Sequence, residues 1–479
     1  MRLLLLLLLP LTLPAQLTLT PNGRHLQDST GTPILLHGDT GWNLSIRLTR
    51  EEVDQYLSKR QEQGFNTIGM AALFEGNLYN VYGDAPFVQV DGQWDPDQPA
   101  TTPGSDPTDT TAYDYWDHLD YAVDQVADHG MYAALVIAFN AMVVGDGHGR
   151  KREQIVFTPA KAYRYGRFVG ARYGHHDHII WMLGGDRSPV YGEYDYRPVY
   201  HAMAEGVADG INGEDDFDGR ANYSGILMSY HPQKARPASS EWFHDAPWNS
   251  FNSIQSCPDA IAEVIRADLV LAPTKPTWLF EGRYEEYTFA YRDWVARFQA
   301  YRALTAGAFG HLYGNRYVWN YDSTWQQHLD DPGAHDMRHL YTLFTTAVPG
   351  YGWGDWQPYD GLLTATDPGS ITNTCWRNQE GAPEADFVTA MRSTDRRAAL
   401  IYAANGRSFA IDTTQLANTP TAAYWYSPRT GHYYDPQDQR EHPTPRNVLA
   451  TQDADYSFDP PGQPARDNDW VLLLIARAR

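Results

Sequence analysis

The sequence predicts an α/β protein, a (β/α)8 TIM barrel followed by a C-terminal antiparallel β-sandwich. Strand-like and helix-like segments alternate over about 320 residues, as they do in such a barrel. The strand-like segments are apolar on both faces, which is typical of a parallel sheet buried on both sides. After Gly350 the pattern changes to short alternating strands between turns. We therefore expect a barrel over 16–350, a linker over 351–385 and a sandwich over 386–479.

Eight segments are candidates for the barrel strands: 33–39, 65–73, 131–139, 179–186, 225–232, 250–256, 277–282 and 306–314. Helices are expected between most of them, at 49–63, 115–130, 158–173, 195–210 and 290–305, and another at 334–346. Such alternation with right-handed crossovers fits a closed barrel. An open doubly wound sheet is the alternative. It would normally carry a glycine-rich phosphate loop after its first strand, and the sequence contains neither G-x-G-x-x-G nor a P-loop.

The segment after 385 predicts the sandwich. Its strand candidates are DFVTAMRS, RAALIYAA, RSFAIDT, TAAYWYSP, YYDP and DWVLLLIA. Turns such as Asn405-Gly406 and Arg429-Thr430-Gly431 separate them. Short alternating strands between turns of this kind are typical of antiparallel sheets packed face to face.

The composition and the N-terminus predict a secreted or periplasmic protein. The net charge is −22 and no Lys/Arg cluster is present, which disfavours nucleic acid and anionic membrane surfaces as partners. The N-terminus, MRLLLLLLLPLTLPAQ, has the pattern of a signal peptide over 1–15, with cleavage near Ala15–Gln16. No later segment is apolar enough to insert into a membrane after that cleavage. The oligomeric state and the pairing of Cys257 with Cys375 stay open.

No cofactor or metal is expected. The sequence has no Cys/His set with zinc spacing and no H-E-x-x-H. The cluster GHHDH at 174–178 precedes the fourth strand, at the face of the barrel opposite to the reactive one, so we interpret it as solvated loop histidines. No G-x-S-x-G is present, which disfavours a serine hydrolase.

Polar and aromatic side chains stand where the predicted strands end. In a TIM barrel these C-terminal strand ends form the active face, so the residues there are the candidates for the site. They are Asp39, Trp42, Asn140, Asp186, Arg187, Tyr230, His231, Gln255, Glu281, Arg283, Tyr313 and Asn315.

Two of these candidates are carboxylates that follow apolar strands, Asp186 on the fourth and Glu281 on the seventh. Glycosidases use such a pair: one carboxyl protonates the leaving oxygen while the other attacks the anomeric carbon. Structural pairing of each carboxylate with the arginine close to it is the competing interpretation. Glu285 and Glu286 lie farther past the strand end and rank second to Glu281. Glu75 and Asp39 are further candidates for a catalytic carboxylate. We interpret Asp39 as a residue that binds a sugar hydroxyl.

Several motifs in order resemble the apiosidase-like glycoside hydrolases. They are LLHGDTGW, Tyr56-x-x-x-Arg60 with GFNTI, VYGDAPF, IIWMLGGDR, SYHP with SSEWFH, FNSIQS and FEGRYE. The tail, with AMRS, IYAANG, AYWYSPRTG, FDPP and DWVLLL, resembles a companion domain named for collagen binding. The resemblance spans about 20–479.

The resemblance implies a TIM barrel with an acid/base after strand four and a nucleophile after strand seven. Carried over by motif, Asp186 in GGDR is the acid/base and Glu281 in E-x-x-Y-E is the nucleophile. It also implies release of apiose from pectin side chains. The sequence departs from the family pattern at Phe280, where a small residue is usual, and at Phe139-Asn140.

Three functional hypotheses follow. The first is a retaining hydrolase of a pectin-like plant polysaccharide that releases apiose. The second is a non-catalytic carbohydrate- or collagen-binding surface protein, and two carboxylates facing one cleft would argue against it. The third is a glycosidase for another sugar, such as an arabinose- or galactose-containing chain.

Overall fold

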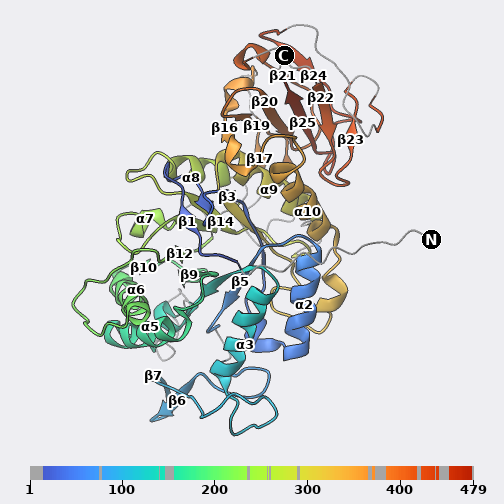
Figure 1. Cartoon of the computed structure of the whole chain (residues 1–479). Helices are drawn as coiled ribbons and strands as arrows, with labels where there is room; N and C mark the ends of the chain where they lie inside the picture. Colours follow the sequence, from blue (N-terminus) through green and yellow to red (C-terminus); the bar gives the residue numbers. More distant parts are fainter. Residues whose placement is uncertain are drawn as a thin grey trace.

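The computed structural model describes the chain over the following residues: 14–74, 78–139, 141–145, 156–234, 238–255, 257, 260–287, 292–364, 369–372, 384–417, 422–436, 439–441 and 452–476. Figure 1 shows the N-terminal two thirds as a barrel with surrounding helices, and the C-terminal third as a separate β domain. Among the described helices, none is long and apolar enough to cross a membrane.

Eight parallel strands form the barrel, in the spatial order β12-β9-β8-β5-β4-β15-β14-β13. In chain order they are β4 (Leu36–Thr40), β5 (Thr67–Ala71), β8 (Tyr132–Val136), β9 (Ile179–Gly184), β12 (Met228–His231), β13 (Asn252–Gln255), β14 (Thr277–Glu281) and β15 (Gly310–Tyr313). Each overlaps one of the eight segments predicted from sequence, and β4 alone among them extends past its segment, by one residue, to Thr40. Their nearly uniform burial explains why the sequence pattern marked them so clearly.

The two ends of this sheet, β12 and β13, also lie together. The Ser250 amide donates to the Met228 carbonyl at 2.8 Å. The Ser229 hydroxyl donates to the Phe251 carbonyl at 2.6 Å, and the Ser253 hydroxyl donates to the Tyr230 carbonyl. Serine hydroxyls therefore bridge the seam where the regular ladder is missing. The barrel closes, and the alternative of an open doubly wound sheet is wrong.

Helices cover the outside of the barrel. They are α1 (Leu44–Arg47), α2 (Arg50–Glu62), α3 (Tyr115–Asp128), α4 (Ala141–Val144), α5 (Pro159–Tyr173), α6 (Arg197–Asn212), α7 (Ser240–Phe243), α8 (Ile261–Asp268), α9 (Asp293–Ala306) and α10 (Pro332–Thr345). Helix α2 begins where the sequence predicts it, because Thr49 and Glu52 form a capping box. Helix α8 was not predicted; it spans only 8 residues.

Short strands decorate the barrel. Strands β1 (Thr18–Leu19), β2 (Leu26–Gln27) and β3 (Pro33–Ile34) form a small sheet before β4. The long loop after β5 carries a hairpin of β6 (Phe87–Val90) and β7 (Gln93–Pro99), and a second hairpin pairs β10 (Val190–Tyr191) with β11 (Tyr194–Asp195). Arg164 on α5 holds the first hairpin through Asp97, at 2.8 and 2.6 Å.

The C-terminal domain is built on a six-stranded antiparallel sheet, in the order β16-β19-β20-β25-β22-β23. These strands are β16 (Trp356–Pro358), β19 (Val388–Ser393), β20 (Ala398–Ala403), β22 (Ala422–Tyr426), β23 (Tyr433–Tyr434) and β25 (Trp470–Ile475). Two small sheets accompany it: β17 (Ile371–Thr372) with β18 (Glu384–Ala385), and β21 (Phe409–Ile411) with β24 (Tyr456–Phe458). The predicted fold class is confirmed. Within 351–385, expected as a linker, β16 pairs with β19.

Both faces of the six-stranded sheet are buried. One face packs on the β21–β24 pair through a core that includes Phe409, Trp425 and Leu472. The other face packs on α9 and α10, where Tyr301 stacks on Tyr402 with ring centroids 4.4 Å apart. In Figure 1 these two helices lie between the barrel and the β domain. Helices α9 and α10 of the barrel therefore form one side of the hydrophobic core of the β domain.

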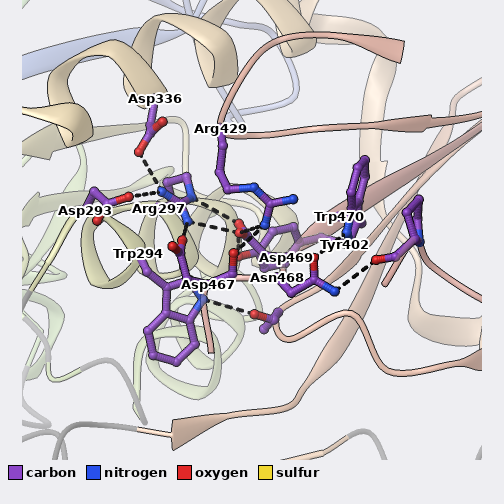
Figure 2. Close-up of polar contacts among 12 residues, drawn as sticks. Asp293, Trp294, Arg297, Asp336, Tyr402, Arg429, Asp467, Asn468, Asp469 and Trp470 are labelled. Atoms are coloured by element: carbon purple, nitrogen blue, oxygen red, sulfur yellow. Dashed lines mark hydrogen bonds and ion pairs between the residues drawn. The ribbon is translucent and has the colours of Figure 1, made fainter. Parts of the chain in front are cut away.

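An ion cluster centred on Arg297 joins the two domains (Figure 2). Arg297 lies on α9 and its side chain is fully buried. It contacts Asp293 and Asp336 on the barrel side, and Asp467 and Asp469 on the β-domain side. Arg429 adds a second guanidinium, 3.3 Å from Asp469. These buried ion pairs therefore fix the orientation of the two domains relative to each other.

Candidate active site

A cavity of about 190 Å³ opens at the C-terminal ends of the barrel strands. Its walls combine aromatic rings with charged and polar groups. The lining residues are Trp42, Phe74, Phe139, Asp186, Lys234, Gln255, Glu281, Gly282, Arg283, Tyr284, Tyr287 and Trp319. A concave site of this composition, at this end of a TIM barrel, is where catalytic groups are expected.

Glu281 ends β14, and two donors hold its carboxylate. Its Oε2 lies 2.8 Å from Nε2 of His231, and its Oε1 accepts from the Tyr284 hydroxyl at 2.8 Å. The indole of Trp42 donates to the same hydroxyl at 2.7 Å. The carboxylate is therefore fixed in orientation from both sides, although its side chain is 13% exposed to the cavity.

The surroundings of His231 are aromatic. The ring lies 5.0 Å from Phe280, 5.6 Å from Trp42 and 6.0 Å from Phe139, measured between centroids. Phe280, the residue that departs from the family pattern, thus packs edge-on against the histidine that holds Glu281. These rings keep water away from the fully buried His231, which strengthens its hydrogen bond to Glu281.

Asp186 stands on a sharp turn after β9. Gly184, Gly185 and Asp186 all have positive φ angles, of 81°, 146° and 53°. A side chain at Gly185 would meet the ring of Phe139, so only glycine lets the chain pass that wall of the cavity. The Asp186 carboxylate is one-third exposed and lies 2.9 Å from Nη1 of Arg187. The turn therefore directs a carboxylate into the cavity that Glu281 also lines.

Gln255 and Arg283 bring polar groups to the same cavity. Gln255 ends β13 and is 8% exposed, and its buried Oε1 has no hydrogen-bond donor among the described residues. The backbone of Arg283 is held by the Gln299 amide, at 2.8 and 2.7 Å. Lys234, on the neighbouring loop, also lines the cavity. The site thus offers one unused acceptor and two cations.

Other residues predicted for the site lie elsewhere. Asp39 is fully buried and accepts from Nε of Arg60 at 2.6 Å and from the Tyr56 hydroxyl at 2.7 Å, both on α2. Tyr230 packs on Tyr200 of α6 and donates to the Arg187 carbonyl at 2.9 Å.

Tyr313 donates to Glu285, and the Asn315 amide donates to Asp331 at 2.8 Å. Alternate side chains of a strand point to opposite faces, so a strand-end position does not by itself decide between the cavity and the helices. Asn140 and Glu75 lie outside the described residues.

Comparison with known families identifies both domains. Residues 20–348 match the family described as "Apiosidase-like, catalytic domain". The chain belongs to the apiosidase-like family. Residues 376–475 match the family described as "Putative collagen-binding domain of a collagenase". Both matches agree with the resemblance that the sequence motifs indicated.

Solved structures share the two-domain fold of this apiosidase-like protein. A glycoside hydrolase family 5 structure from Bacteroides vulgatus ATCC 8482 is 24% identical with a TM-score of 0.74, and covers 96% of this chain and 93% of its own. A second structure, described as a glycoside hydrolase, is 23% identical with a TM-score of 0.74, and covers 98% and 99%. No curated protein matches the chain. The protein is a glycoside hydrolase, so the alternative of a non-catalytic binding protein is not supported.

The two competing glutamates of the apiosidase-like barrel have other partners. Glu285 is buried, and it accepts from the Tyr313 hydroxyl and, at 3.1 Å, from the Gly333 amide at the start of α10. Burial raises the pKa of Glu285 to about 8. Glu286 pairs with Arg292 at 2.8 Å. Neither lines the cavity, so neither takes the place of Glu281 there.

Sequence reasoning missed much of the aromatic wall and one partner of Glu281. Tyr284, Tyr287, Trp319 and Phe74 come from loops, where no strand end marked them. Tyr284 carried a signal, because it is the tyrosine of the E-x-x-Y motif. The histidines at 174–178 lie before β9, and His178 contacts the Val123 carbonyl at 3.0 Å. Within the described residues, no group of His, Cys, Asp and Glu side chains is arranged to hold a metal ion.

Proposed function

We propose that this enzyme hydrolyses glycosidic bonds with retention of configuration, with Glu281 as the nucleophile and Asp186 as the acid/base. The observation that carries the proposal is that both carboxylates line one cavity, at the ends of β9 and β14. The hydrogen bonds of Glu281 to His231 and Tyr284 support the assignment, because a nucleophile must be held in line with the reacting carbon.

The reaction has two steps. In the first, a Glu281 oxygen bonds to the anomeric carbon, while Asp186 gives its proton to the departing oxygen and the glycosidic bond breaks. In the second, Asp186 takes a proton from water, and the water oxygen displaces Glu281 from the anomeric carbon. Asp186 ends the cycle protonated, and Glu281 ends it as a carboxylate.

The remaining cavity residues are assigned to the substrate. Trp42 and Trp319 offer aromatic faces to the apolar side of a sugar ring. The Oε1 of Gln255, which has no donor among the residues that the structure describes, is assigned to a sugar hydroxyl, since a buried acceptor without a donor is costly. Arg283, together with Arg187 beside Asp186, is assigned to a substrate carboxylate.

We further propose a pectin-like plant polysaccharide as the substrate and apiose as the released sugar. The family match supports apiose, and the Arg283 guanidinium and the Lys234 ammonium at the cavity support a uronate next to the cleaved bond. The leucine-rich N-terminus supports secretion to the cell exterior or the periplasm.

The decisive experiment compares Asp186→Ala and Glu281→Ala with the parent enzyme on apiose-bearing pectic oligosaccharides. Screening arabinose- and galactose-containing chains beside them identifies the sugar. Loss of the acid/base lowers kcat by about 10²–10⁴-fold. Loss of the nucleophile abolishes turnover, and added azide restores Glu281→Ala with formation of a glycosyl azide. Wild-type rates in folded variants would overturn the residue assignment. A product of inverted anomeric configuration, observed by NMR, would overturn retention alone.

A further inference from the structure

The β domain carries a second, larger cavity that the catalytic site does not use. Its volume is about 530 Å³, within the range of about 300–1,000 Å³ typical of small-molecule sites. It lies where the chain leaves α10 and enters the six-stranded sheet, and it shares no lining residue with the catalytic cavity. Its walls are Pro349, Gly350, Tyr351, Asp355, Thr394, Asp395, Arg397, Ala422, Tyr424, Ile475 and Ala476, and we call it the junction groove.

Two tyrosines that are far apart in the sequence, Tyr351 and Tyr424, form the aromatic surface of the junction groove. Tyr351 and Tyr424 are both half-buried, and each is backed by another ring. Tyr351 lies 5.7 Å from Trp356, and Tyr424 lies 5.5 Å from Tyr433, between centroids. Rings fixed in this way offer a flat apolar face with little entropy left to lose on binding.

Charged groups supplement these rings. Asp395 accepts from the Tyr351 hydroxyl at 3.1 Å, from the Ser393 hydroxyl at 2.6 Å and from the Arg397 amide at 2.9 Å. Asp355 accepts from the Gly352 amide at 2.7 Å. Hydrogen bonds therefore hold both carboxylates of the groove in fixed orientations.

Arg397 brings a guanidinium to the wall of the groove. Its Nε is buried and has no acceptor among the described residues, although the residue lines the groove. A guanidinium carries five N–H donors, so Arg397 can donate to ligand oxygens through its terminal nitrogens. The groove holds two carboxylates against one guanidinium in a chain of net charge −22, so an anionic ligand is disfavoured.

We propose that the junction groove is a second carbohydrate site, which binds a neutral stretch of a polysaccharide chain. A sugar ring has an apolar C–H face for the tyrosines, and its hydroxyls both donate to carboxylates and accept from Arg397. The enzyme acts on carbohydrate. A second binding site for the same polysaccharide chain would raise the local concentration of glycosidic bonds at the catalytic cavity of the barrel. This inference does not depend on which residues perform the hydrolysis.

The test is affinity electrophoresis of the full-length Glu281→Gln variant through native gels that contain soluble arabinan, galactan or xyloglucan. We expect at least one of these neutral polymers to retard the protein. Adding Tyr351→Ala and Tyr424→Ala should raise the dissociation constant from the gel series roughly tenfold or more, since buried aromatic contacts dominate such sites. Arg397→Gln keeps both tyrosines and should also weaken binding; thermal melting verifies that each variant is folded.

Two variants serve as controls. Tyr194→Ala and Phe217→Ala change side chains that are 41% and 50% exposed and lie outside both cavities; both should keep the retardation. The proposal is overturned if no neutral polymer retards the protein. It is equally overturned if the folded groove variants are retarded as strongly as their parent, or if only polygalacturonate or gelatin retards it.

Discussion

Asp39 and Glu281 both lie near the C-terminal end of a barrel strand, yet they meet different partners. Asp39 faces α2 and is enclosed by Arg60 and Tyr56, which are the Arg and Tyr of the Y-x-x-x-R motif. Glu281 faces the cavity and is held by His231 and Tyr284. The HGD and Y-x-x-x-R motifs therefore tie β4 to α2, whereas the strand-seven motif supplies the carboxylate that we propose as the nucleophile. A family motif can record a fold contact as readily as a catalytic one.

Replacing Asp39 should therefore cost stability. Asp39→Asn leaves Arg60 fully buried beside a neutral partner, and breaking a buried ion pair costs about 3–5 kcal/mol. The free energy of unfolding, measured by urea denaturation, should fall by that order while KM stays unchanged. The matched control is Asp97→Asn, which breaks the surface pair with Arg164 and should cost at most about 1 kcal/mol. A raised KM with unchanged stability would instead mean that Asp39 binds substrate.

Removal of the Tyr284 hydroxyl should act on turnover. Tyr284→Phe deletes the donor to Glu281 Oε1 and leaves the Trp42 indole without its acceptor. A hydrogen bond to a charged group contributes about 1.5–3 kcal/mol, so we expect kcat to fall roughly 10- to 100-fold. Tyr313→Phe removes a comparable buried hydroxyl, from Glu285, and should lower the melting temperature but not kcat. Equal kcat losses in both variants would argue against a specific role of Tyr284.

At the scale of elements, the sequence predicted the barrel well because strands such as β8 and β9 are apolar runs between turn signals and recur in alternation with helices. It also pointed to Asp186, Glu281 and Gln255, which the structure brings to one cavity. It could not separate them from Asp39, Tyr230 and Tyr313, since the face of a strand-end side chain depends on twist and register. The loop residues Trp319 and Tyr287 follow no periodic pattern, so only the folded chain reveals them.

The turn after β9 is an element whose geometry is tied to the site. In Gly184→Ala the new methyl would lie 2.5 Å from the Tyr230 ring and 2.8 Å from the His231 carbonyl, at a φ of 81°. Movement of His231 disturbs Glu281, so kcat should fall and stability should drop by about 2–5 kcal/mol from strain plus overpacking. Gly192→Ala also has positive φ but open space around it, and should cost only about 1 kcal/mol without a change in kcat. Thermal melts followed by circular dichroism give the stability of both variants, and steady-state kinetics give kcat. An unchanged kcat in Gly184→Ala would contradict the prediction.

At the scale of the whole molecule, the β domain is an integral part of the fold. The six-stranded sheet buries α9 and α10, and the buried Arg297 draws carboxylates from both domains (Figure 2). Desolvation of these charges is costly and the pairing offsets it, so the cluster contributes more to fixing the domain geometry than to net stability. The barrel is thereby stiffened on the side where β14 and β15 are followed by α9 and α10.

The cluster should make stability depend on pH through Asp336. Burial raises the pKa of this carboxyl to about 7, against the opposing effect of Arg297. A group with a raised pKa in the folded state contributes stability that is present below its unfolded value of 3.8 and is lost as the pH rises to about 7. Asp336→Asn keeps an acceptor for Arg297 but removes the titration. Relative to the parent, its free energy of unfolding should therefore rise between about pH 4 and pH 7, by at most about 1.4 kcal/mol per pH unit.

A surface carboxylate supplies a control of opposite sign for that measurement. Asp330 pairs with Lys59 at 2.8 Å, and that hydrogen bond lowers the pKa of Asp330. Its contribution is present above the unfolded pKa and is lost as the pH falls through the folded one, so Asp330→Asn should be destabilising near pH 7 and neutral in acid. The pair is solvent-exposed, so the effect should be small. Urea titrations of the three proteins at fixed pH values would contradict the role of Asp336 if its variant tracked the parent between pH 4 and pH 7. In that case the proton would reside elsewhere in the Arg297 cluster.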